Sequence, residues 1–294
     1  MENGFLNILK MPGLTSSDVV FRIRKMLPRG VKVGHGGTLD PDAAGVLPVC
    51  VGRATRLFDY MIDKEKVYLT ELTLGAVTDT QDASGEILTS SVVTATPADV
   101  CAVLPKFIGD ILQTPPAYSA IKRDGQRMYQ LARAGIDTPL DPRPVRISAV
   151  EYVCQSSPNA FMLRIRCGKG VYIRTLCHDI GAMLGCGGYM SFLLRTRAGV
   201  FDISEGLLID HLTPSNLREH LCALDAPVVN LPAVHLGASA RRDVINGKPI
   251  PWDVPPGPVR LYVGGDFAGI GMGEADGFIH IKAMLLEVDH GTAR

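Results

Sequence analysis

The stretch 31–56 constrains this chain most, because it joins a glycine-rich loop to a long apolar run. Three glycines precede Asp40, and small or apolar residues follow from 43 to 51. Glycine lets a backbone approach another group closely. Pro41 fixes its own φ and restricts Asp40 to an extended conformation. We therefore expect a carboxylate held on a rigid turn beside an apolar wall. The glycines are Gly34, Gly36 and Gly37.

Asp40 also has a purely structural interpretation, as the start of a helix. Aspartate is a favoured N-cap residue, and proline is favoured at the first helical position. For an isolated Asp-Pro pair this interpretation is the stronger one. The choice depends on the whole string from 34 to 48, which reads GHGGTLDPDAAGVLP.

Composition narrows the class of protein. A chain of 294 residues with 46% hydrophobic content can bury a large core and predicts one sizeable domain plus a small one. We find no signal-peptide pattern and no run near the roughly 18 apolar residues that cross a bilayer, and we expect a cytoplasmic protein without membrane contact. The seven cysteines form no C-x-x-C pair, which favours neither a disulfide framework nor a zinc site.

Charge is balanced overall but uneven along the chain. A net charge of zero argues against indiscriminate coating of nucleic acid. Between residues 115 and 200, however, the chain contains twelve Lys or Arg but only five acidic residues. Either an RNA-contacting patch or a solvated basic face fits this run, because sequence does not show whether the side chains converge.

Local patterns predict strands and helices in one continuous series. The expected strands lie at 4–10, 67–76, 145–153, 160–167 and 191–201, the last closing the main sheet, and the expected helices lie after Thr15 and at 97–104, 125–134 and 171–185. From about 230 onward, short strands between Gly and Pro turns predict a small β-barrel. The acidic segment 78–86 lacks calcium-loop spacing, so we expect a turn closed by Asx bonding.

The string GHGGTLDPDAAGVLP resembles the active-site loop of the bacterial stand-alone tRNA pseudouridine(55) synthases, the TruB-type family. Further similar strings are KMPGLTSSDVV at 10–20, QTPPAYSAIK at 113–122, KGVYIRT at 169–175 and SFLLRTRAGVF at 191–201. The resemblance implies an α+β fold, with a mixed, largely antiparallel central sheet flanked by helices and loops. It implies a catalytic domain over 1–229, with an RNA-gripping segment at about 104–146, and a PUA-like RNA-binding barrel over 230–294.

The resemblance also implies roles for single residues. Asp40 matches the catalytic nucleophile, Arg174 the arginine that pairs with it, and Tyr68 the active-site tyrosine. Leu193 matches a substrate-contacting leucine, and the loop carrying Lys122 matches a segment that contacts RNA. Two further side chains are suited to the same site: Tyr172 as another wall, and His35 as a group that fills the space left by the base or holds the RNA backbone. A structural, hydrogen-bonded role fits His35 equally well.

The implied reaction breaks the bond between ribose C1′ and base N1 and rejoins the base through C5. It needs neither redox chemistry nor energy input, and the chain has no P-loop or metal-ligand motif, so we expect no cofactor and no metal. Burial would neutralise Asp40, whereas the Arg174 guanidinium favours its charged form. Tyr68 offers a ring for stacking and a hydroxyl for proton transfer. A uridine in a folded arm must leave its stack, so we expect base flipping.

Several positions depart from the family pattern. Asp42 stands where an apolar residue is usual, and its charge would raise the pKa of Asp40 unless it points to solvent. Gly36 replaces a common Thr and loosens the loop. Leu194 replaces an Arg, which removes one RNA contact, and Met11 replaces a Pro.

Three rival functions remain open from the sequence. One is an RNA-binding or tRNA-folding module without activity, and the intact set of Asp40, Tyr68 and Arg174 argues against it. Another is the synthase subunit of a guide-RNA particle, which shares the LDP tripeptide. A carboxylate glycosidase would need a second catalytic acid, and none is evident. The favoured hypothesis is a monomeric enzyme that acts on the T arm of tRNA and needs no protein partner.

Overall fold

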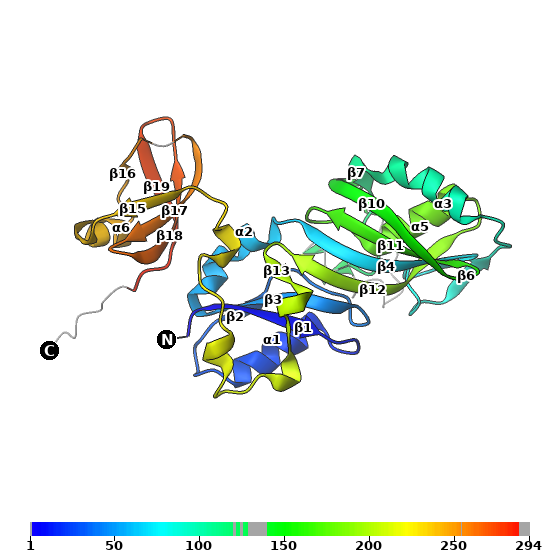
Figure 1. The fold of residues 1–294 in the computed structure, drawn as a ribbon, viewed down its shortest axis with the longest axis horizontal. Coiled ribbons are helices and arrows are strands. Elements are labelled where there is room, and N and C mark those ends of the chain that lie inside the picture. Colours follow the sequence, from blue (N-terminus) through cyan, green and yellow to red (C-terminus); the bar gives the residue numbers. More distant parts are fainter. Residues whose placement is uncertain (1, 120–121, 124–125, 129–139, 254, 288–294) are drawn as a thin grey trace.

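The computed structural model describes residues 2–119, 122–123, 126–128, 140–253 and 255–287. A long sheet with helices packed on it forms the body of the molecule, and a small sheet stands at one end (Figure 1). The body is therefore a mixed α+β structure, as predicted.

The central sheet has the strand order β14-β1-β3-β12-β4-β11-β10-β7, with β2 and β13 paired beside β3 and β12. Its strands are β1 (Gly4–Lys10), β2 (Val33–His35), β3 (Ala44–Val51), β4 (Lys66–Leu74), β7 (Gly109–Gln113), β10 (Arg143–Ser157), β11 (Ala160–Cys167), β12 (Gly188–Ala198), β13 (Phe201–Asp202) and β14 (Leu207–Leu208). The pairs β1–β14 and β3–β12 are parallel, and the other pairs are antiparallel. The prediction of a mixed, largely antiparallel sheet is confirmed.

Helices cover this sheet and share its core. They are α1 (Ser16–Lys25), α2 (Phe58–Ile62), α3 (Pro97–Val103) and α5 (Ile173–Met183), with the 3₁₀ turn η1 (Gly52–Leu57) before α2. Thr15 caps α1: its hydroxyl accepts from the Asp18 backbone, and the Asp18 carboxylate accepts in return. Buried residues of α1, α3 and α5 join those of the strands in one apolar cluster, which includes Ile23, Val100 and Leu176.

Two predictions about elements need correction. The strand expected to close the sheet is β12, and it lies in the interior between β3 and β4. Sequence patterns mark a strand but not its neighbours, and the parallel pairing with β3 is long-range. The helix expected at 125–134 does not begin there, because β9 (Gln126–Arg127) pairs with β8 (Lys122–Arg123). The remainder of that helix, from 129, lies outside the described residues.

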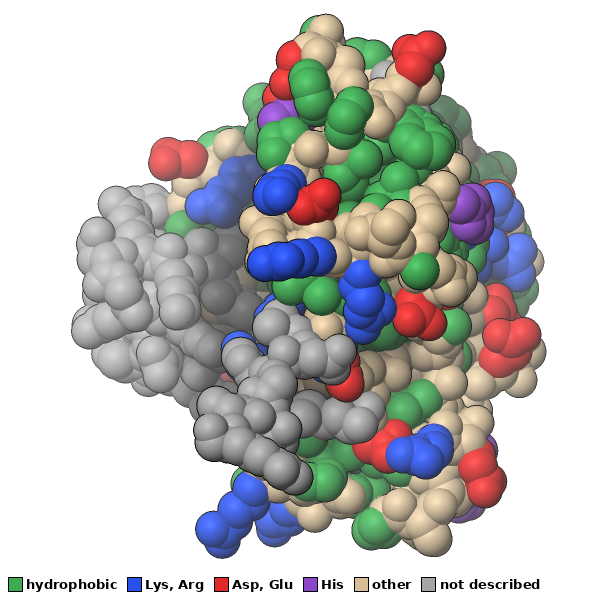
Figure 2. Space-filling view, turned by 90° about the vertical axis from the view of Figure 1, so that its left-hand side faces the viewer, with side chains coloured by type: hydrophobic (Ala, Val, Ile, Leu, Met, Phe, Trp, Pro, Cys, Tyr) green, Lys and Arg blue, Asp and Glu red, His purple; other side chains and the backbone are tan. Residues whose placement is uncertain are grey.

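The small sheet contains five strands in the order β15-β17-β18-β19-β16. They are β15 (Ala233–Leu236), β16 (Ile250–Pro251), β17 (Gly257–Val263), β18 (Asp266–Gly273) and β19 (Phe278–Met284), with α6 (Arg241–Ile245) between the first two. This order has two ends, so the described residues form an open sheet, and the predicted small β-barrel is not confirmed. Figure 2 looks at this end of the molecule and shows acidic and basic side chains interspersed over most of the face.

An apolar cluster fastens the small sheet to the body. Ile270 and Leu285 from the small sheet and the segment after it pack with Phe5 of β1 and with Val228 of the connecting segment, and all four are buried. The Arg53 guanidinium adds a polar contact, donating to the Leu285 carbonyl at 2.7 Å. Within the described ranges, no helix has both the length and the apolar character needed to span a bilayer.

Candidate active site

Asp40 lies on the loop that joins β2 to β3. The Ala43 backbone donates to the Asp40 carbonyl at 3.1 Å, which closes a turn, and the chain then enters β3. No helix follows Asp40, so its interpretation as an N-cap is wrong. The loop is held on both sides of the acid: the Ser16 hydroxyl accepts from the Leu39 backbone at 2.9 Å, and the Lys10 ammonium donates to the Pro41 carbonyl at 2.8 Å.

Arg174 meets Asp40 with two guanidinium nitrogens. Nε lies 3.1 Å from Oδ2, and Nη2 donates to Oδ1 at 3.3 Å. The same guanidinium donates to the carbonyls of Thr80 and Tyr118, at 3.1 and 2.8 Å, and lies 3.4 Å from the Asp82 carboxylate. The Arg174 side chain is only 7% exposed, whereas that of Asp40 is 36% exposed. The arginine is therefore the buried, fixed partner, and the carboxylate is the group accessible to a ligand.

The pKa of Asp40 is shifted in the direction opposite to the one expected from its pairing with Arg174. Burial raises the pKa of Asp40 above its usual value and outweighs the opposing positive charge of Arg174. The negative charge of Asp82 adds to the increase, and Asp42, which is exposed, adds less. The carboxylate is thus held closer to protonation than a surface aspartate.

A cavity of about 340 Å³ opens beside this ion pair. Its lining combines the predicted site residues from separate elements: Asp40, Tyr68, Tyr172, Arg174 and Leu193. The volume lies at the lower end of the range found for small-molecule sites, roughly 300–1,000 Å³. Such a space suits one extruded nucleoside rather than a larger ligand.

The two tyrosines that the sequence predicted for the cavity are fixed in different ways. Tyr68 lies in β4 opposite Arg195 of β12, and both are buried. Burial raises the pKa of Tyr68, and the nearby Arg195 charge opposes the increase, so its hydroxyl keeps its proton at neutral pH. Tyr172 precedes α5, and the Gln113 side chain donates to its carbonyl at 3.0 Å and accepts from its backbone N–H at 2.8 Å.

Not every predicted residue reaches the cavity. His35 is half-buried in β2 and is not among the cavity-lining residues. Lys122 belongs to β8, and its side chain lies outside the described part of the chain. Packing explains the glycine at position 36. A Cβ there would lie 2.0 Å from Cε of Met61, so the side chain of Met61 occupies the space that a Thr would need.

Arg195 is the main residue that sequence reasoning missed. It is 1% exposed and donates to the carbonyls of Val46 at 2.7 Å and Gly37 at 3.1 Å. It therefore fixes the backbone on both sides of the Asp40 turn. A signal was present, because Arg195 falls two residues after Leu193 and so shares the buried face of its strand.

Lys66 and Asp82 were also missed. Lys66 lines the cavity, and burial lowers its pKa to about 8. Asp82 belongs to the acidic segment that the sequence indicated only as a turn. That turn is present, because the Asp82 carboxylate accepts from the Ser84 backbone at 3.0 Å, but the other carboxylate oxygen faces Arg174.

One group of side chains has the composition of a metal site. Among the described residues, Glu274, Asp276 and His280 place one ligand atom each within 4.8 Å of one another, on the hairpin of β18 and β19. Glu274 already lies 3.4 Å from the Lys282 ammonium, and both acids are exposed. Their contacts are those of a surface ion-pair network.

Comparison with known protein families identifies the family of this chain. Residues 24–173 match the model described as TruB family pseudouridylate synthase (N terminal domain), and residues 174–228 match the tRNA pseudouridylate synthase B C-terminal domain. The tRNA pseudouridine synthase B of Heliobacterium modesticaldum is 46% identical over 237 residues, which cover 80% of this chain and 77% of the relative. The chain belongs to the TruB family.

Other relatives extend the match over almost all of the chain. The tRNA pseudouridine synthase B of Clostridium kluyveri is 39% identical over 95% of this chain and 99% of its own length. Among solved structures, one from a Cbf5-Nop10-Gar1 complex is 27% identical, with a TM-score of 0.70, and the match covers 92% of this chain and 78% of that one.

The TruB match also locates the ion pair. Asp40 and Tyr68 fall within the matched N-terminal domain, and Arg174 is the first residue of the second matched segment. The central ion pair of this TruB protein therefore joins two segments that the family models treat as separate.

Proposed function

We propose that this TruB-family protein isomerises uridine 55 in the T arm of tRNA to pseudouridine. The observation that carries the proposal is the two-point contact of Asp40 with a buried Arg174 at the wall of a nucleoside-sized cavity. The curated relatives that it matches at 39–46% identity are called tRNA pseudouridine synthase B. The family strings around these residues support the same reaction.

Each residue of the cavity has its own role in the proposed reaction. The Asp40 carboxylate acts as the nucleophile, and the Arg174 guanidinium both aims it and favours its ionised form. While the base is detached, the walls of Tyr68, Tyr172 and Leu193 retain it as it turns from N1 to C5. When the new C1′–C5 bond has formed, C5 loses its proton and N1 gains one, so the product is an isomer. The protonated Tyr68 hydroxyl is placed to hydrogen-bond the base during this exchange.

The remaining predicted contacts concern RNA outside the cavity. His35 and Lys122 hold RNA next to the flipped nucleotide, with Lys122 in the gripping segment 104–146. Residues 1–229 form the catalytic domain, and 230–294 form a PUA-like RNA-binding domain. The separate five-stranded sheet of β15–β19 supports the assignment of a second, small domain. The protein works in the cytoplasm as a monomer without protein partners.

Asp40→Asn tests the nucleophile. The amide is nearly the same size but has no negative charge, so we expect tRNA affinity to stay within about twofold while turnover falls by at least roughly a thousandfold. Pseudouridine is measured on a purified tRNA transcript by carbodiimide adducts that block primer extension.

Asp42→Asn is the matched control, because Asp42 is exposed two residues away and contributes least to the pKa of Asp40. We expect near-normal turnover from it. Full activity of Asp40→Asn would end the assignment of the nucleophile. Failure of the unmodified protein on bare tRNA would instead favour a subunit that needs partners, as in the Cbf5-Nop10-Gar1 complex.

A further inference from the structure

A second concave surface lies at the C-terminal end of α1. Its lining comes from the end of that helix, the loop into β2 and Thr55 of η1, and it encloses about 700 Å³. We call this surface the basic cup. Its charged residues are all cationic: Arg24, Lys25, Arg29 and Lys32.

The basic cup gathers four cations without acidic partners into one concave surface. Elsewhere about half of the described basic side chains lie within 4.0 Å of a carboxylate, as Arg22 does with Asp210 at 3.0 Å and Arg218 with Glu2 at 2.8 Å. None of the four cations of the cup lies within 4.0 Å of a carboxylate of any described residue. In a chain with no net charge, this concentration is a local field that attracts anions.

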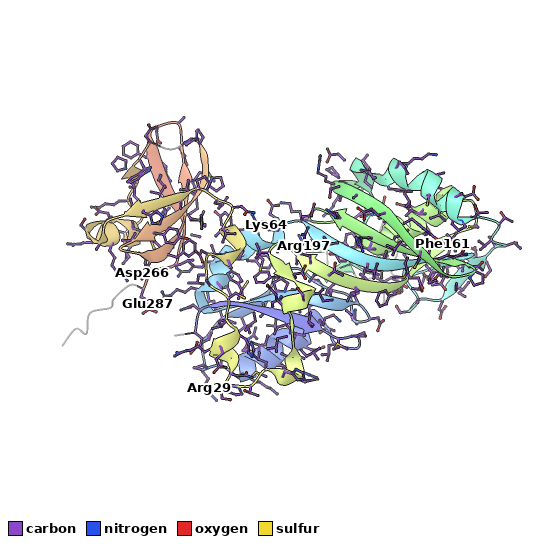
Figure 3. The ribbon with its side chains drawn as sticks, viewed as in Figure 1. Arg29, Lys64, Phe161, Arg197, Asp266 and Glu287 are labelled. Carbon is purple, nitrogen blue, oxygen red and sulfur yellow. The ribbon has the colours of Figure 1, made fainter. Side chains whose placement is uncertain are left out.

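Two of these cations are held in place by the protein itself. The Arg24 guanidinium donates to the Val33 carbonyl at 3.3 Å, and the Lys25 ammonium lies 4.4 Å from the centre of the Phe21 ring. Arg29 and Lys32 are exposed, and Figure 3 labels Arg29 at the lower margin of the body.

The basic cup is close to the cavity along the chain. Val33 lines the cup, and Gly37 lines the cavity beside Asp40. Four residues of fully extended chain reach at most about 14 Å. That distance corresponds to roughly four nucleotides of rise along one strand of a nucleic-acid duplex. A nucleic acid with one base in the cavity can therefore bring phosphates a few nucleotides away over the cup.

We propose that the basic cup binds the sugar-phosphate backbone of the substrate RNA, on the duplex that flanks the flipped nucleotide. This proposal rests on the proposed function for the identity of the RNA. Arg24 and Lys25, whose charged groups contact the protein, supply two of the charges, and Arg29 and Lys32 supply the other two. The cup contributes affinity and register, and it takes no part in bond breaking, because none of its residues lines the cavity.

The test removes two of the four exposed charges, those that make no hydrogen bond or ring contact to a described residue, with Arg29→Ala and Lys32→Ala together. The matched control is Arg22→Ala with Arg218→Ala, which removes the same charge from two acid-paired surface positions. Affinity is measured between about 0.05 and 0.2 M salt, with a tRNA transcript that carries cytidine at the target position and so cannot react. Turnover is measured on the normal transcript.

We expect the cup variant to bind about tenfold more weakly near 0.1 M salt, and its salt slope to fall by about 2, one unit for each phosphate that is no longer neutralised. KM should rise with kcat unchanged, and the control should match the unmodified protein. Equal losses of affinity in both variants, or none in either, would overturn the proposal. Arg29→Gln with Lys32→Gln, checked by circular dichroism, excludes misfolding as the cause. If the unmodified protein makes no pseudouridine, the proposed function fails, while the affinity comparison still tests the cup.

Discussion

At the scale of single residues, the site depends on opposing influences on one carboxylate. Burial and the Asp82 charge raise the pKa of Asp40, and Arg174 is the principal group that opposes them. As the proposed nucleophile, Asp40 must be ionised to react. Arg174 therefore sets the lowest pH at which the carboxylate is available, in addition to orienting it.

This balance predicts a pH dependence. As pH falls through the raised pKa, Asp40 takes up a proton, so the single-turnover rate with bound RNA should decline on its acid side. Arg174→Gln removes the opposing charge and should move that decline upward by about one to three pH units, with a lower maximum. Rates are measured across pH by rapid quench, with binding to Asp40→Asn at each pH as the control. An acid limb at the same pH in both proteins would contradict the charge balance.

The pKa shift also has a consequence for stability. Because the folded protein holds the Asp40 proton more tightly than the unfolded chain, ionisation of Asp40 lowers stability as pH rises through the folded pKa. Asp40→Asn should therefore unfold at the same or a higher urea concentration at neutral pH. This is the opposite of what loss of a purely structural aspartate would cause.

The sequence predicted the site residues that lie within short recognisable motifs. It missed residues whose role depends on contacts between distant parts of the chain. Asp40, Tyr68, Arg174 and Leu193 lie in family-like strings, and all four line the cavity. In the sequence, Arg195 is one basic residue among many. Its acceptors, the carbonyls of Val46 in β3 and Gly37 in the loop before it, lie about 150 positions earlier in the chain.

At the scale of elements, the contact between β3 and β12 determines where the active loop begins. Gly45 pairs with Arg195 across this parallel contact, and its φ is +109°. A Cβ at Gly45 would lie 2.2 Å from the Arg195 carbonyl oxygen. The sequence showed an apolar run here but not this close approach, since register between distant strands has no local pattern.

Gly45→Ala should therefore be severely destabilising. We expect a loss of about 3 kcal/mol or more in the free energy of unfolding, from backbone strain together with overpacking. Gly13→Ala is the control: its φ is +85° but the space around it is open, so strain alone should cost about 1 kcal/mol. Both are measured by urea unfolding. Equal losses would show that the β3–β12 contact relaxes freely.

At the scale of the whole molecule, the small sheet shares an apolar cluster with the body. Ile270 and Phe5 are completely buried in it, although they belong to opposite ends of the chain. Separating the two parts would expose this surface to water. The sequence indicated the change of texture near residue 230, but it contained no sign of the shared cluster.

This cluster predicts that the two parts unfold together. Trp252 is the single tryptophan and lies at the small sheet, so its fluorescence reports on that part, whereas far-UV circular dichroism reports mainly on the body. We expect the two signals to give the same midpoint in urea, as two-state unfolding requires. An earlier fluorescence transition would show that the small sheet is an independent unit.

The contacts of Arg174 determine how much of the chain must be synthesised before the site can form. One side chain gathers the acid at 40, backbone from 80 and 118 and the acid at 82, all earlier in the chain than itself. No nascent or partly folded piece that ends before residue 174 can assemble the reactive centre. Completion of the site therefore waits for synthesis of the chain through residue 174, about three fifths of its length.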